Sequence, residues 1–120
     1  MILVDTSVWV DHLRSGNEQL EALLLDVQVA CHPFLVGELA CGGIVNRKEM
    51  MSLLAALPRA TVATHDEALG FLDTKIHAGA GIGWIDVHLL ASAALTGVHL
   101  WTLDTRLRKV SKTLGVMWRP

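Results

Sequence analysis

Short apolar runs alternate with longer amphipathic segments along this 120-residue chain, and this alternation limits the folds that it can adopt. The first run, Ile2 to Val4, stops directly at Asp5. A short continuous apolar run without polar alternation is typical of a strand buried on both faces of a parallel sheet. Four further strands are predicted at residues 27–31, 60–63, 99–103 and 116–118.

Helix signals fill the intervals between the predicted strands. Thr6 and Ser7 offer hydroxyl caps before the first helix, and Pro33 suits the first turn of the third. Thr64-His65-Asp66-Glu67 is a capping-box pattern at the start of the fifth. The predicted helices span residues 8–14, 18–26, 33–41, 47–57, 64–78, 84–95 and 105–114. Strands that alternate with helices predict one α/β domain over residues 1–120, a three-layer sandwich around a mostly parallel five-stranded sheet.

The composition and the N-terminus bear on where the protein works. Hydrophobic residues make up 52% of the chain, yet charged residues interrupt every apolar run before it reaches the roughly 20 residues of a membrane span. The N-terminus lacks the basic segment and long apolar segment of a secretory signal. We therefore expect a cytoplasmic protein without a membrane partner, in which Cys31 and Cys41 are reduced, buried thiols.

Basic residues are concentrated near the C-terminus. The formal net charge of -2 excludes the overall basicity of many nucleic-acid-binding proteins, so a polyanion would have to be bound by a metal ion or by a local patch. No acidic residue follows Asp104, whereas five of the ten basic residues do: Arg106, Arg108, Lys109, Lys112 and Arg119. This segment is a candidate contact surface, with a solvated helix face as the alternative for each residue.

Four of the twelve acidic residues have no ordinary surface explanation. Asp5 and Asp104 each follow an apolar run and precede a predicted helix. The carboxyl ends of parallel strands meet at one edge of a sheet, so these two carboxylates are expected to lie close together if their strands are neighbours. Glu38 and Asp86 have only apolar or small neighbours three and four residues away on their helices.

Each of these carboxylates has a structural alternative when it is considered alone. Asp5 or Asp104 could cap the helix that follows it, and Asp86 could complement the dipole at the start of its helix. Glu38 could pair with a distant arginine. Their joint occurrence, beside apolar strands and inside apolar helices, favours one shared site.

A shared site of four carboxylates needs positive charge or protons. Carboxylates about 5 to 6 Å apart, at an effective dielectric of about 20, repel by roughly 3 kcal/mol per pair, and the sum over all pairs exceeds the usual net stability of a domain. Either some are protonated, with raised pKa values, or divalent cations neutralise them. Oxygen ligands alone suit Mg²⁺ or Mn²⁺ better than Zn²⁺, and such ions activate water and neutralise phosphoryl oxygens.

These segments together resemble the PIN-domain nucleases, and most closely the VapC toxins of bacterial toxin–antitoxin pairs. The resemblance extends nearly from end to end, and the order and spacing of its motifs are more specific than any single motif. It rests on the opening Ile-Leu-Val-Asp5-Thr6-Ser7-Val-Trp, on Glu38 in an apolar helix, on Asp86 at the start of a helix rich in Ala and Leu, and on Thr102-Leu103-Asp104 after a late strand.

The resemblance implies a sheet order of 3-2-1-4-5, endonucleolytic cleavage of RNA such as transfer or ribosomal RNA, a homodimer, and inhibition by a cognate antitoxin. It implies that the catalytic residues, which hold Mg²⁺ or Mn²⁺, are Asp5, Glu38, Asp86 and Asp104. Their hydrogen-bond partners would be Thr6, Ser7 and Thr102. The RNA or the antitoxin would contact Arg106, Arg108 and Lys109. We expect in-line attack by an activated water, leaving a 5′-phosphate and a 3′-hydroxyl.

Other functions fit the sequence less well. The histidines form no zinc-binding motif, and G-x-S-x-G is absent. The Gly79–Gly83 segment follows a predicted helix and lacks a phosphate-loop lysine, so a linker is the better interpretation. A receiver-type signalling domain would need an acceptor Asp in 60–63 and a Lys in 116–118, and neither is present. The receiver and a catalytically silent binding module of the same fold are the alternatives.

Overall fold

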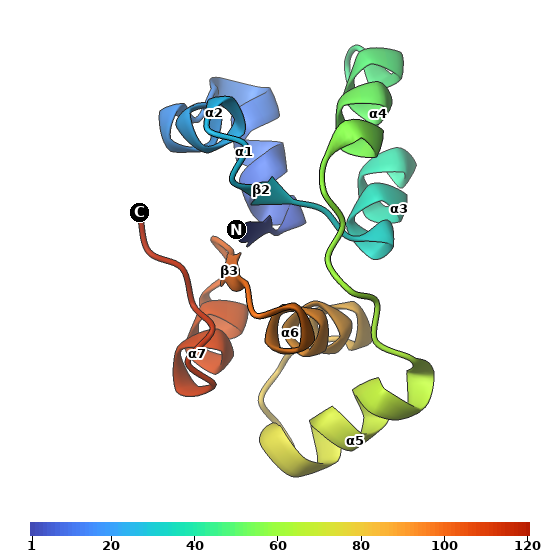
Figure 1. Cartoon of the computed structure of the whole chain (residues 1–120), viewed down its shortest axis with the longest axis vertical. Helices are drawn as coiled ribbons and strands as arrows, with labels where there is room; N and C mark the ends of the chain where they lie inside the picture. The colour runs from blue at the N-terminus through green and yellow to red at the C-terminus, as the bar shows by residue number, and fades with distance from the viewer.

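The computed structural model describes residues 1–120 and contains three strands and seven helices (Figure 1). In chain order they are β1 (Ile2–Val4), α1 (Thr6–Ser15), α2 (Glu18–Leu25), β2 (Val29–Ala30), α3 (Pro33–Cys41), α4 (Arg47–Ala56), α5 (His65–Lys75), α6 (Trp84–Thr96), β3 (His99–Trp101) and α7 (Thr105–Thr113). No helix is long and apolar enough to cross a membrane.

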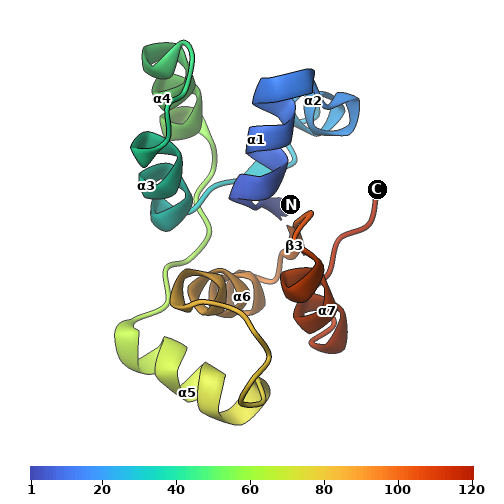
Figure 2. The same ribbon diagram turned by 180° about the vertical axis from the view of Figure 1, so that it is seen from behind.

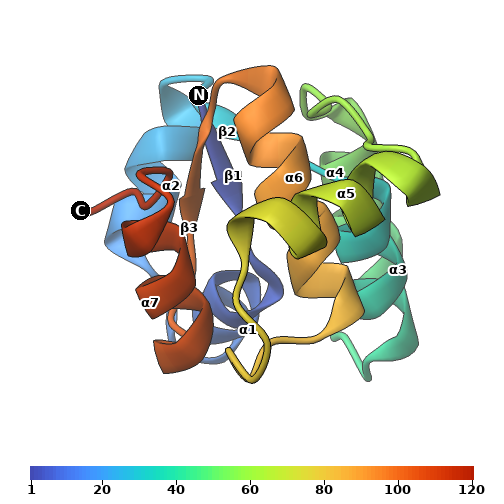
Figure 3. The ribbon, with the colours of Figure 1, turned by 90° about the horizontal axis from the view of Figure 1, so that it is seen from below.

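The sheet is parallel, with the order β2-β1-β3 and β1 at its centre. Leu3 is in register with Ala30 on one side and with Leu100 on the other. Figure 3 shows β1 and β3 side by side with their arrowheads toward the same edge. The residues that directly follow these two strands therefore lie at one edge of the sheet.

The prediction of five strands is wrong in number, because the two outer strands are reduced to isolated parallel bridges. One bridge joins Cys31 to Arg59 beside β2, and the other joins Leu100 to Met117 beside β3. Each outer segment has a strand on only one side, and its pairing ends after one bridge. The bridges nevertheless flank the three strands on the sides where the expected order places the outer pair.

Helices cover both faces of the sheet, which gives the predicted three layers. Leu3 belongs to a core with residues of α5, α6 and α7, whereas its neighbours Ile2 and Val4 belong to a second core with residues of α1, α2 and α4. Figures 1 and 2 show α1 and α2 on one side of the strands and α6 and α7 on the other. Burial on both faces explains why β1 is continuously apolar.

Helix starts differ from the predictions where a hydroxyl has a longer-range partner. α1 begins at Thr6 and not at Val8, so Thr6 and Ser7 lie inside its first turn and do not cap it. At α5 the predicted capping box is present: Glu67 N–H donates to Thr64 Oγ1 over 3.1 Å, and Thr64 N–H donates to Glu67 Oε1 over 2.9 Å. The capping box predicted from the local sequence is confirmed here, because Thr64 and Glu67 have no competing hydrogen bond to a distant residue.

The two cysteines have different environments. Cys31 is buried, as predicted, and burial raises the pKa of its thiol. Cys41, at the end of α3, is exposed, so the prediction of two buried thiols is wrong for this residue. The apolar face of α3 is completed by Leu35 and Leu39, which leaves its last residue at the surface.

Candidate functional site

The fold brings together the four carboxylates singled out from the sequence. Asp5 follows β1, Asp104 follows β3, Asp86 lies in the first turn of α6, and Glu38 lies on α3. Burial raises the pKa of the Asp86 carboxyl, and the negative charges of Asp5, Asp104 and Glu38 raise it further. Asp86 is thus close enough to interact with all three, and no cation is among the groups that shift its pKa.

Hydroxyl groups from two elements fix the Asp5 carboxylate. Asp5 is only 7% exposed, and its Oδ2 atom accepts hydrogen bonds from Ser7 Oγ over 2.8 Å and from Thr102 Oγ1 over 2.7 Å. The two hydroxyls are themselves 3.2 Å apart. Asp5 N–H also donates to the Trp101 carbonyl over 2.9 Å. The end of β1 is therefore tied to the end of β3 through both backbone and side chain.

Asp104 is held by the same network and also caps a helix. Its backbone N–H donates to Thr102 Oγ1 over 3.0 Å, and the neighbouring Leu103 N–H donates to Ser7 Oγ over 2.9 Å. Its Oδ1 atom accepts a hydrogen bond from Leu107 N–H over 2.9 Å at the start of α7. The capping alternative for Asp104 is thus a real role, and it occupies only one of the two carboxylate oxygens.

Glu38 and Asp86 each have one hydrogen-bond donor. Thr6 Oγ1 donates to Glu38 Oε1 over 3.1 Å, which links α1 to α3. Gly83 N–H donates to Asp86 Oδ2 over 3.3 Å, in the position expected of an acidic residue that satisfies a free helix N-terminus. Like Asp5 and Asp104, these side chains use one oxygen in hydrogen bonds and leave the other without a protein donor.

A buried histidine to which the sequence assigned no role links the start of α3 to α6. His32 is fully buried before the start of α3, and its Nδ1 atom accepts a hydrogen bond from Phe34 N–H over 3.0 Å. The proton therefore resides on Nε2, which lies 3.1 Å from Ser92 Oγ on α6. Burial lowers the pKa of His32 to about 4, so the ring is neutral at pH 7. The contact fixes α3 against α6.

The donor chemistry of the four carboxylates fits a hard divalent cation. Each offers one oxygen free of protein hydrogen bonds while the other is oriented by a donor, the arrangement that helps a carboxylate to hold an ion. As the side chains stand, no three His, Cys, Asp or Glu side chains converge closely enough to hold a metal ion. Mutual repulsion between the four anions would oppose a closer approach, and a bound cation would offset it.

The predicted basic contact residues occupy two places. A hollow of about 580 Å³ is lined by Arg108 and Lys109, together with Lys112 and Arg119. Arg106 lies elsewhere, against the loop before α6: a Cβ built on Gly81 would be 3.1 Å from its Cδ atom. We call the four-cation hollow the basic groove.

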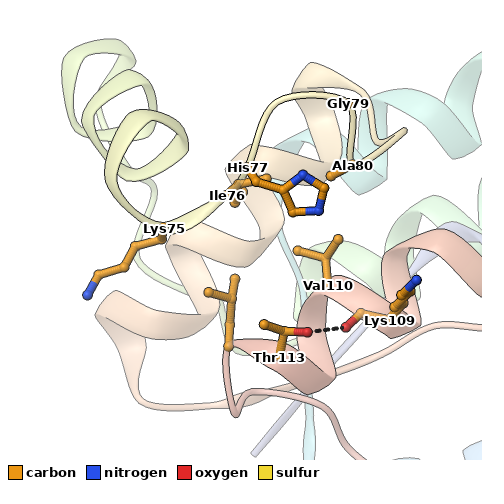
Figure 4. A pocket seen from close by; sticks show the side chains of 9 residues that line it. Lys75, Ile76, His77, Gly79, Ala80, Lys109, Val110 and Thr113 are labelled. Atoms are coloured by element: carbon orange, nitrogen blue, oxygen red, sulfur yellow. Dashed lines mark hydrogen bonds between the residues drawn. The ribbon is translucent and has the colours of Figure 1, made fainter.

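A separate cavity of about 150 Å³ lies between the end of α5, the following loop and α7 (Figure 4). It is lined by residues that include Ile76, His77 and Val110, and by none of the four carboxylates. Lys75 contributes to its wall, but Figure 4 shows its side chain extending away from the other lining residues. We therefore assign no role in the carboxylate site to this cavity.

The sequence and the fold of the chain are similar to those of known proteins. The sequence model of the PIN domain matches residues 2–113. The chain is 45% identical over 117 residues to Ribonuclease VapC32 of Mycobacterium tuberculosis, in both strain CDC 1551 / Oshkosh and strain ATCC 25618 / H37Rv, covering 97% of this chain and 94% of each relative. The crystal structure of PAE2754 from Pyrobaculum aerophilum has a similar fold, with a TM-score of 0.62 and 17% identity over 93% of this chain and 80% of that one.

Replacing Asp86 by Asn should stabilise the metal-free protein at pH 7. Its pKa is raised in the folded state, so the charged carboxylate costs stability above that pKa, and the cost disappears as the pH falls toward the ordinary value of 3.8. Urea unfolding in EDTA should therefore give a larger unfolding free energy for Asp86→Asn at pH 7 and a smaller difference near pH 4.

Asp66→Asn is the matched control, because Asp66 also lies in the first turn of a helix but is exposed. It loses the same favourable dipole interaction, worth about 0.3 to 1 kcal/mol, without any relief of repulsion. An Asp86→Asn protein less stable than the wild type at pH 7 would contradict the assigned repulsion.

Proposed function

The chain belongs to the PIN-domain family, as one of its VapC-type ribonucleases, and from this premise we propose that Mg²⁺ or Mn²⁺ drives its RNA hydrolysis at Asp5, Glu38, Asp86 and Asp104. It is the toxin endoribonuclease of a VapBC-type module. Family membership removes the receiver-type alternative. A silent module of the same fold is the alternative that an RNA-cleavage assay tests.

The observation that carries the proposal is the shared environment of four carboxylates from four distant segments. The negative charges of Asp5, Asp104 and Glu38 raise the pKa of Asp86. No positively charged side chain is among the groups that shift this pKa. Each carboxylate has one oxygen oriented by a donor from the protein. Such a set is stable near neutral pH when a hard cation occupies it.

When bound, the divalent ion supplies charge neutralisation at the phosphate and activation of the attacking water. The protein's own residues supply orientation. Ser7 and Thr102 hold Asp5 through Oδ2, so Asp5 would be oriented to hold the ion. Thr6 acts in the same way on Glu38. Strand ends and helices hold the backbones of the four carboxylates, so that only side-chain movement would be needed to bring them around an ion. We expect in-line attack on the phosphodiester, which leaves a 5′-phosphate and a 3′-hydroxyl.

We also propose the setting in which this activity operates. Residues 1–120 would act as a single domain in the cytoplasm, with transfer or ribosomal RNA as the substrate class and a cognate VapB antitoxin as inhibitor. A homodimer is supported by large apolar side chains left at the surface. Leu25 is 87% exposed and Val45 is 80% exposed, and a second copy of the chain could cover such side chains.

The basic groove is proposed to contact the RNA backbone. α7 begins at Thr105, directly after its capping residue Asp104, and its residues Arg108 and Lys109 line the groove. At a rise of about 1.5 Å per residue, the backbones of Arg108 and Lys109 lie about 6 to 8 Å from that of Asp104 along the helix axis. An RNA strand bound at the carboxylates could therefore place neighbouring phosphates in the groove.

Asp5→Asn should abolish most RNA cleavage while leaving the fold intact. Loss of outer hydrogen-bond partners of metal ligands costs about 10- to 100-fold in activity, so loss of a ligand should cost at least about 100-fold. Cleavage of single-stranded RNA by the purified wild type should also stop in EDTA and return on addition of Mg²⁺ or Mn²⁺.

Asp66→Asn serves as the control for an acidic residue outside the site, and circular dichroism confirms folding of each variant. Wild-type protein that cleaves RNA equally well in EDTA would remove the metal from the mechanism. Purified wild-type protein that cleaves no RNA with either ion would instead favour the silent module.

Neutralising the basic groove should weaken RNA binding and its dependence on salt. The double substitution Arg108→Gln with Lys112→Gln removes up to two cations that neutralise phosphates, so the slope of log affinity against log salt should fall by about 0.7 for each of them. Lys48→Gln with Lys75→Gln, on α4 and α5, removes the same charge elsewhere. Equal slopes for both doubles, measured by fluorescence anisotropy, would place the RNA away from the groove.

A further inference from the structure

A second hollow opens directly beside the carboxylates, between α3 and the start of α6. Its volume is about 630 Å³, and its lining includes Phe34, Gly37, Glu38, Cys41 and Trp84. We call it the aromatic hollow. Glu38 belongs both to this lining and to the carboxylate site, so whatever fills the hollow lies next to the point at which RNA is proposed to be cut.

Trp84 forms an aromatic wall of the hollow and is 37% exposed, so part of its ring is accessible to a ligand. It makes an edge contact with His88 at 4.7 Å between ring centroids and another with His65 at 5.3 Å. Phe34 packs in the same way against His88, at 4.7 Å, and against the buried His32, at 5.1 Å. This chain of rings holds the two lining aromatics in place before any ligand arrives.

Gly37 keeps space open on the α3 side of the hollow. A glycine inside a helix costs about 1 kcal/mol relative to alanine, so it needs a reason. A Cβ atom built at Gly37 would meet nothing within 4 Å, which shows that no neighbouring group requires the glycine for packing. Gly37 lines the hollow, so a larger side chain at this position is expected to occupy part of it.

We propose that the aromatic hollow binds one unpaired RNA base next to the scissile phosphate. This inference rests on the proposed function and names the part of the substrate that the site recognises beyond the phosphate. A base is neutral and flat, and proteins bind unpaired bases by stacking them on aromatic side chains. Base and phosphate of one nucleotide are joined through a single sugar, so a base beside Glu38 keeps its phosphate at the carboxylates.

The charges around the hollow favour a base over the anionic part of RNA. The Glu38 carboxylate on its rim repels phosphate that is not bound to a cation, whereas the neutral base has no such conflict. The phosphates instead have the basic groove on α7. The two hollows thus divide the substrate chemically, with base stacking at α3 and α6 and backbone contact at α7.

Steady-state cleavage of short single-stranded RNA tests the stacking contact. Trp84→Ala should raise KM about tenfold or more, as expected for loss of one stacked base, and change kcat less than about twofold. Trp84→Phe should restore most of the affinity, because it keeps a ring. Gly37→Leu should raise KM to a similar extent by filling the hollow without removing Trp84.

Two matched controls separate blocking from general damage. Gly70→Leu introduces the same side chain in the middle of α5, where a Cβ also meets nothing within 4 Å. Leu95→Ala removes an exposed apolar side chain from the far end of α6. Neither should change KM. An RNA with an abasic position at the cleavage site should bind the wild type more weakly than the intact RNA does. Trp84→Ala should bind the two RNAs with equal affinity.

Cys41 provides a readout that does not need catalysis. It is exposed and lines the hollow, whereas Cys31 is buried, so N-ethylmaleimide should label Cys41 selectively. In an Asp5→Asn background, which prevents turnover, single-stranded RNA with Mg²⁺ should slow this labelling several-fold. The abasic RNA should protect much less than the RNA that carries the base.

The outcomes discriminate the base site from the nuclease function on which it rests. If the wild type cleaves RNA but Trp84→Ala and Gly37→Leu leave KM and Cys41 protection unchanged, the base site is overturned and the nuclease stands. The base site is also overturned if these variants lower only kcat, since the hollow would then have a structural role. It is likewise overturned if they lose only binding of a co-expressed antitoxin, since the hollow would then be the contact surface for that protein. If the wild type neither cleaves nor binds RNA, both proposals fall.

Discussion

Two hydroxyl groups that donate to one buried carboxylate oxygen set the geometry on which the site depends. Ser7 comes from the first turn of α1 and Thr102 follows β3, yet both donate to Asp5 Oδ2. Together with the backbone hydrogen bond from Asp5 to Trp101, they align the carboxyl ends of neighbouring strands. Asp104 comes two residues after Thr102, and its backbone N–H donates to the same Thr102 hydroxyl. The contact that holds Asp5 therefore also holds Asp104. The repulsion that results would be relieved by a bound cation, as the proposed function requires.

The sequence predicted the elements whose pattern is local. β1 is a continuous apolar run because Leu3 faces one core while Ile2 and Val4 face the other, and the α5 capping box was found because both of its partners lie three residues apart. The outer strands were predicted to be too long. An apolar segment indicates that a strand is favourable, but it does not show how many of its residues will pair with the neighbouring strand. Pairing there stops after the bridges at Arg59 and Met117.

The sequence singled out four carboxylates that lie near one another in the structure, but it could not predict the contacts that organise them. Apolar surroundings on their own helices identified Glu38 and Asp86, and strand-end positions identified Asp5. His32 could not be found in this way, because its partner Ser92 lies sixty residues away and neither residue belongs to a motif. Trp84 was read only as part of an apolar helix, since exposure of its ring depends on how α6 meets α3.

The central claim is that four carboxylates form one site for a hard divalent cation. Titration of the metal-free protein with Mn²⁺, with free Mn²⁺ followed by electron paramagnetic resonance, tests this claim most directly. We predict saturable binding by the wild type, at least about tenfold weaker binding in Glu38→Gln and in Asp104→Asn, and no change in Asp73→Asn on α5. Equal Mn²⁺ affinity in all four proteins, or none in the wild type, would contradict it.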